Sequence, residues 1–138
     1  MNKERLKRYK WIKQEQRDLE RQLEEVEASL YAATAKPLTG MPTAHGGGNP
    51  AEALAIKHLE LLDTYTNKLA ELVMERQAIE AAIATLEDPR ARMLFRYLYI
   101  DCLRWRDACD KVHYSRSQAN RIHDQALLQL QETEAPDT

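Results

Sequence analysis

The chain has little of what builds β-sheets or disulfide frameworks. Aromatic residues make up 7% of the 138 residues, glycine occurs four times, and 30% of the residues are charged. This composition favours a mainly helical, highly solvated chain with almost no strand. Cys102 and Cys109 are the only cysteines, and their seven-residue spacing is too long for easy bridging along a helix. We expect both to be reduced core residues.

Long apolar runs and enzyme signatures are also missing. No window approaches a membrane span, and no apolar run follows the basic N-terminal segment, so we expect a cytoplasmic protein that does not enter membranes. The glycines at 46–48 lack the Gly-Lys-Ser/Thr of a phosphate loop, and no nucleophile lies at readable spacing from a base. We therefore predict no enzyme, no catalytic residue and no cofactor. No metal site is predicted either, because no zinc spacing is matched by the four candidate ligands, Cys102, Cys109, His113 and His123.

A first long helix is predicted from hydrophobic periodicity. From about Lys3 to Ala33, mostly apolar residues recur in alternating steps of three and four, as in the seam of a coiled coil. The seam positions are Tyr9, Ile12, Gln16, Leu19, Leu23, Val26 and Leu30. Such a helix is about 45 Å long at about 1.5 Å per residue. A single stripe of this length stays exposed unless another helix lies along it, so this helix needs a partner.

The partner helix is predicted to follow a linker. The linker covers residues 34–50. Its stretch 37–46 alone contains two prolines and two glycines, which is too many for a helix. From about Ala51 to Leu86 the same spacing returns, and the two helices can fold into an antiparallel coiled-coil hairpin. The second seam consists of Ala55, His58, Leu62, Tyr65, Leu69, Leu72, Arg76, Ile79, Ile83 and Leu86. A surplus of apolar residues off this seam predicts self-association: Leu59, Leu61, Val73 and Met74.

Three short helices are predicted after the hairpin. Asp88 can cap the first of them, and Pro89 fits its first helical position. The second contains the apolar positions between Trp105 and Val112. After a tight turn, Ser115 is a good N-cap for the third. This succession is typical of a helix-turn-helix unit.

The third short helix carries the candidate binding face. Its apolar face is formed by Ala119, Ile122, Ala126 or Leu127, and Leu130. The opposite face begins with side chains that can reach base edges or phosphates, and it has no carboxylate before Asp124. The same residues also fit an ordinary amphipathic helix with a solvated polar face. Because the whole chain has a net charge of −2, a nucleic-acid role depends on local charge, and residues 88–130 hold eight Lys/Arg against five Asp, a formal +3.

The C-terminal part of the chain resembles a known DNA-binding region. The segments Asp88–Ile100, Leu103–Cys109, Val112–Ser115 and Asn120–Leu127 resemble region 4 of sigma factors. Over residues 37–130 the chain is similar to small phage and prophage proteins with a coiled-coil N-terminal half and a sigma-like terminal domain, related to RinA/ArpU-type late-gene transcription regulators. The resemblance implies promoter-type binding of double-stranded DNA in a bacterial host cell, on the nucleoid.

The resemblance also implies roles for individual residues. The positions that match base contacts in the major groove are Arg116, Ser117, Gln118 and Arg121. The positions expected to contact phosphates are Arg104, Arg106, Asn120 and His123. His113 takes the turn position that is commonly glycine, and histidine is among the residues that tolerate positive φ.

Together these observations predict an all-α chain in three parts: a coiled-coil hairpin at 1–86, a helix-turn-helix domain at 87–132 and a disordered tail at 133–138. We expect a sequence-specific transcription regulator that forms a homo-oligomer, with a dimer favoured, or contacts RNA polymerase through its coiled coil. Two alternatives stay open. The chain could be a DNA-recognition subunit for phage packaging, like a small terminase, or a protein-only adaptor that binds polymerase or a sigma factor.

Overall fold

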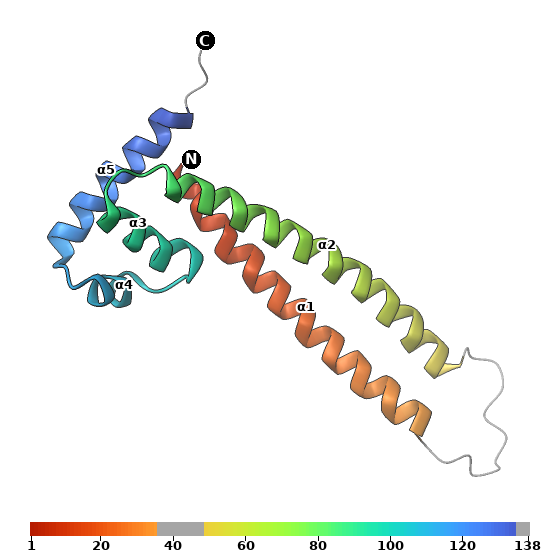
Figure 1. Ribbon diagram of the computed structural model, residues 1–138. Helices are drawn as coiled ribbons and strands as arrows, with labels where there is room; N and C mark the ends of the chain where they lie inside the picture. The colour runs from red at the N-terminus through yellow and green to blue at the C-terminus, as the bar shows by residue number, and fades with distance from the viewer. Residues whose placement is uncertain (36–48, 135–138) are drawn as a thin grey trace. The chain divides into compact units, whose positions relative to one another are not determined.

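The computed structural model describes residues 1–35 and 49–134, and the regular structure of these residues is entirely helical (Figure 1). Two long helices, α1 (Lys3–Ala35) and α2 (Pro50–Ala84), precede the short helix α3 (Pro89–Phe95) and a π-helical turn η1 (Arg96–Ile100). Helices α4 (Trp105–Val112) and α5 (Arg116–Glu134) complete the described chain. The all-α class is therefore confirmed for these residues.

The ends of the predicted linker and tail are helical. Thr34 lies in the last turn of α1, Pro50 begins α2, and residues 133 and 134 belong to α5. The rest of the predicted linker, residues 36–48, and the last four residues of the predicted tail lie outside the described residues. Among the described helices, none combines the length and the apolar character needed to cross a membrane.

Residues Gln14–Ala70 form one compact unit, in which α1 and α2 run antiparallel. The Lys68 ammonium lies 3.2 Å from the Glu15 carboxylate, and His58 Nε2 lies 3.1 Å from Glu27. Glu15 thus faces the end of this stretch of α2 and Glu27 faces its beginning, which is the antiparallel order. Leu23 and Val26 are buried in this unit, as the seam predicts.

The second seam differs from the prediction at two positions. Leu69 is 39% exposed and Arg76 is exposed as well, while the preceding residues, Lys68 and Glu75, turn inward with side chains 20% and 15% exposed. The inward pair is polar because each charge meets an opposite charge on α1: Glu15 for Lys68, and Arg5 for Glu75 at 3.8 Å. The spacing of apolar residues along one helix cannot predict ion pairs with residues of another helix.

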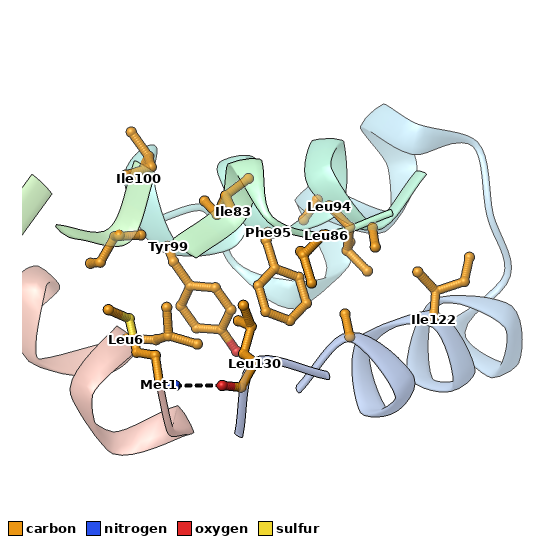
Figure 2. Packing of buried hydrophobic residues seen from close by; sticks show 14 of the residues in the cluster. Met1, Leu6, Ile83, Leu86, Leu94, Phe95, Tyr99, Ile100, Ile122 and Leu130 are labelled. Atoms are coloured by element: carbon orange, nitrogen blue, oxygen red, sulfur yellow. Dashed lines mark hydrogen bonds between the residues drawn. The ribbon is translucent and has the colours of Figure 1, made fainter. Parts of the chain in front are cut away.

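The other compact unit joins Met1–Lys13 to the described residues from Glu71 onward. The predicted boundary after residue 86 therefore does not divide the compact units, because the ends of both long helices pack with the short ones. Figure 2 shows this core, in which Leu6, Leu94 and Phe95 have no exposed surface. The Met1 amine donates a hydrogen bond of 2.8 Å to the carbonyl of Leu130 at the edge of the same core (Figure 2).

The short helices begin and end where local chemistry dictates. The Asp88 carboxylate accepts a hydrogen bond of 2.9 Å from the Arg90 backbone N–H, and Pro89 occupies the first position of α3, which confirms the predicted cap. The pKa of Asp88 is lowered, chiefly by its hydrogen bond from the Arg90 side chain. Cys109 is buried in α4, whereas half-buried Cys102 lies before that helix. The two cysteines therefore do not lie on one helix, contrary to the expectation.

Candidate nucleic-acid interface

Helices α3, α4 and α5 pack on one another around small side chains. Ala108 and Ala119 have no exposed surface, and Cys109 is 4% exposed. All three belong to the same buried cluster as Leu94 and Phe95 of α3. Small residues let helix backbones approach closely, so this cluster fixes α5 against α4 and α3. This packing fixes the orientation of the exposed side of α5.

The turn between α4 and α5 has the backbone geometry predicted for it. His113 is left-handed, with φ 60° and ψ 37°, and its N–H and that of Tyr114 reach back to the carbonyls of Asp110 and Cys109. This arrangement closes α4 in the manner of a helix C-terminus that usually requires glycine. Ser115 then accepts a hydrogen bond of 3.2 Å from the Gln118 N–H, which confirms it as the N-cap of α5.

Helix α5 presents its polar side chains on a broad exposed arc. Ser117 and Arg121 are four positions apart and share one face, with Gln118 beside them, because successive residues turn by about 100°. Arg116 lies about 200° from Gln118, on the flank that also carries Asn120. All five side chains are exposed, and the first turn of α5 holds no acidic residue.

Four arginines of α4 and α5, counting the N-cap of α4, form no ion pair within the described chain. Arg104, Arg106, Arg116 and Arg121 are exposed, and none forms an ion pair with a residue in the described ranges. The contrast is with six arginines that do pair with carboxylates: Arg5, Arg8, Arg21, Arg76, Arg90 and Arg96. Arg92 donates instead to the carbonyls of Leu86 and Glu87. The two arginines at the start of α4 and the two on α5 thus keep their hydrogen-bonding capacity for another molecule.

His123 is the predicted contact that the structure contradicts. Its side chain is buried at 5% exposure, with ring centroids 5.0 Å from Phe95 and 5.5 Å from Trp105. Its Nε2 lies 2.5 Å from the Tyr99 hydroxyl. The Asp124 carboxylate, 3.6 Å from Nδ1, favours a proton on that nitrogen, which leaves Nε2 to accept from Tyr99. The small exposed part of the ring borders the hollow lined by Lys3, Lys7 and Lys10, and not the outward polar face of α5.

The titration of this buried pair follows from its surroundings. Burial lowers the pKa of His123, and Lys3 and Lys7 lower it further against an opposing effect of Asp124. Burial also raises the pKa of Tyr99 to about 12. The histidine is therefore held neutral beneath the exposed face of α5.

Sequence reasoning missed a second set of basic residues near α5. Lys3, Lys7 and Lys10 on α1 border the same hollow as Asn120 and Asp124 of α5. Their spacing of four and three residues is a visible stripe, but only the tertiary packing brings it to α5. Among the described residues, no cluster of three or more histidine, cysteine or acidic side chains could hold a metal ion.

Comparison with known proteins gives one match. Searches of curated proteins and of solved structures each find no match. Residues 54–131 match the family model described as Protein of unknown function (DUF1492). The matched residues take in most of α2, the short helices and most of α5. Because this is more than half of the chain, the protein belongs to the DUF1492 family.

Proposed function

We propose that this protein is a sequence-specific DNA-binding protein in which α4 and α5 act as a helix-turn-helix and α5 is the recognition helix. The observation that carries the proposal is the set of four exposed arginines without an ion pair in the described chain, Arg104, Arg106, Arg116 and Arg121. Arg116 and Arg121 belong to α5, whose first turn has no carboxylate, and Arg104 and Arg106 lie at the start of α4. Guanidinium groups in this setting suit both phosphate oxygens and the guanine edge.

The arc of α5 favours entry by its N-terminal end. Arg116 and Gln118 point to nearly opposite sides of the helix, so a helix lying lengthwise in a groove would turn one of them away from the bases. An end-on approach brings Arg116, Ser117 and Gln118 to the groove floor together, with Arg121 one turn behind. The partial positive charge of the helix N-terminus adds attraction for DNA.

In this arrangement Arg104 and Arg106, at the start of α4, contact phosphates beside the groove. Asn120 lies on the flank of α5 and takes the same role. Two acidic residues on α4, Asp107 and Asp110, are exposed and limit the local attraction. The net formal charge of residues 88–130 is nevertheless +3, so the electrostatic contribution is positive but modest.

The two long helices are proposed to be an antiparallel coiled-coil hairpin that sets the oligomeric state. Exposed apolar side chains on α2 support self-association: Leu59 is 66%, Val73 is 48% and Met74 is 71% exposed. Burying such side chains between two copies is favourable at about 25 cal/mol per Å². A dimer would bring two recognition helices to one DNA site, as expected of a transcription regulator of the phage and prophage type that the sequence resembles.

The test is a DNA titration with matched arginine variants. A duplex enriched from a random-sequence pool would be titrated by fluorescence anisotropy at low salt. Arg116→Ala and Arg121→Ala should each weaken binding by about 1–3 kcal/mol, roughly 5- to 150-fold, if they contact base edges. The control is Arg17→Ala, because Arg17 is also exposed and has no ion pair in the described residues but lies in the unit 14–70.

Absence of enrichment, or an equal loss in the Arg17→Ala control, would refute the proposal and leave the protein-only adaptor. Light scattering on the complex separates the remaining candidates. A dimer on a promoter-like site fits a regulator, whereas a ring of many subunits fits a packaging subunit.

A further inference from the structure

A hollow of about 570 Å³ lies within the unit formed by Met1–Lys13 and the residues from Glu71 onward. The first three turns of α1 form one wall. The segment from Leu98 to Trp105 and the flank of α5 around Asn120 form the others. This volume falls in the range of about 300–1,000 Å³ that small-molecule sites occupy. DNA binding by Arg116 and Arg121 makes no use of it.

One wall of the hollow is a row of lysines. Lys3, Lys7 and Lys10 follow each other at steps of four and three, so they share one side of α1. None of them has an ion-pair partner in the described part of the chain. On another side of the same helix, Arg5 and Arg8 are each paired with a glutamate of α2. The lysines that face the hollow therefore provide positive charge that is not tied up in an ion pair within the described chain.

The remaining surface of the hollow is largely aromatic and apolar. Trp11 and Trp105 both line it, together with Leu98 and Leu103. Trp11 is 61% exposed although it borders an apolar surface. A large ring left in water next to a concave apolar surface gains most by covering the flat face of another molecule. Asp124 is the single carboxylate in the lining, and it stands against three ammonium groups.

We propose that this hollow is a binding site for a small organic anion that combines a flat aromatic body with a carboxylate, sulfonate or phosphate group. The anionic group lies against Lys3, Lys7 and Lys10, and the aromatic body stacks between Trp11 and Trp105. Inorganic phosphate supplies only half of this chemistry, and the sugar-phosphate backbone of duplex DNA offers no free aromatic face. The site is therefore distinct from the proposed DNA surface on α5.

The chain offers a direct measurement, because its two tryptophans both line the hollow. Anilinonaphthalene sulfonate, an aromatic anion, is the probe. It should quench tryptophan fluorescence by energy transfer, saturate at one molecule per chain, and be displaced by naphthoate but not by equimolar inorganic phosphate. The double variant Lys7→Gln/Lys10→Gln should bind the dye at least tenfold more weakly. Trp11→Phe should lose a large part of the quenching signal while the helix content stays unchanged.

Matched controls make the outcome decisive. Lys57→Gln/Lys111→Gln removes the same charge at exposed lysines outside the hollow and should leave dye affinity within twofold. An equal loss in this control, or no saturable quenching in the wild-type protein, would overturn the proposal. Arg116→Ala/Arg121→Ala should retain dye binding even if DNA binding is lost, which separates this site from the proposed function. Displacement of the dye by duplex DNA would instead assign the hollow to the DNA surface and overturn a separate ligand site.

Discussion

Replacing Tyr99 with phenylalanine should destabilise the protein without disturbing the exposed polar face of α5 that we propose binds DNA. The ring of Tyr99 packs edge-on against Phe95 with centroids 5.2 Å apart, and phenylalanine preserves that contact. What is lost is the hydroxyl that lies 2.5 Å from Nε2 of His123, a side chain only 5% exposed. A buried acceptor left without a donor costs about 1–3 kcal/mol. At roughly 4 °C per kcal/mol for a chain of this size, the Tm should fall by about 4–12 °C.

Replacing His123 tests whether the loss of stability arises from the Tyr99–His123 hydrogen bond. His123→Leu leaves the Tyr99 hydroxyl without its acceptor and should cost a similar amount. The double variant Tyr99→Phe/His123→Leu removes both polar groups and should be more stable than the two single losses added together. The coupling should be about 1 kcal/mol or more. Urea unfolding followed by circular dichroism measures all four corners of this cycle.

The same variants decide between a structural and a DNA-contacting His123. A buried residue changes the folded fraction but not the affinity of folded molecules, so DNA titration well below the Tm should give the wild-type Kd for His123→Leu. If His123→Leu instead keeps the wild-type Tm and loses DNA affinity as Arg121→Ala does, the burial argument is wrong and the histidine is a phosphate contact.

The pH dependence of stability provides a further check on this pair. Burial lowers the pKa of His123 in the folded protein, so the unfolded chain takes up its proton first as the pH falls. Stability should therefore be complete above about pH 6.5, the ordinary histidine value, and decline as the pH falls below it. In Tyr99→Phe/His123→Leu the decline between about pH 6.5 and 5 should be absent. Asp18 and Asp88 have lowered pKa values, so their protonation reduces the stability only below about pH 4.

Three other variants test the local geometry by thermal unfolding. Ser115→Ala should cost about 1 kcal/mol because the Gln118 N–H loses its cap, and a change below the error would show that the cap contributes nothing. His113→Gly should stabilise by up to about 1 kcal/mol by relieving the left-handed backbone, whereas a loss would mean that the ring itself is needed. Glu75→Leu should stabilise by about 1 kcal/mol, because one oxygen of Glu75 is buried without a hydrogen bond while Arg5 stays 43% exposed and hydrated. Destabilisation would show that the pair with Arg5 outweighs this cost.

Much of the fold could be predicted because it depends on neighbours in the sequence. Ser115 and Asp88 cap helices through N–H groups two or three residues away, and His113 satisfies a turn that connects adjacent helices. Such interactions are local, so residue type and spacing indicate them. The long helices were recognised for the same reason, since three-and-four spacing is a property of one helix.

The errors arose where the partner is distant in sequence or the residue type misleads. The apolar side chain of Leu69 predicted that this residue faces α1. Lys68 faces α1 instead, because its ammonium group pairs with Glu15 on that helix. His123 is four residues after Ala119, so its spacing already put it on the buried face. The resemblance to sigma region 4 placed it among the phosphate contacts instead. The lysine stripe of α1 gained meaning only when folding brought it beside α5, more than a hundred residues away.

The packing of the core depends on the number of residues in the π-helical turn Arg96–Ile100, and not only on which residues they are. In this turn the Asp101 N–H bonds to the Arg96 carbonyl, five residues back, so the turn holds one residue more than an α-helical turn. Deleting a single residue here would restore regular helix and rotate everything behind it by about 100°. A deletion before Tyr99 would turn Tyr99 and His123 together away from Phe95, which now lies against both rings, and the path toward α4 would begin in another direction. A one-residue deletion in this segment would act as a change of angle for the two helices that follow, even if every remaining side chain were kept.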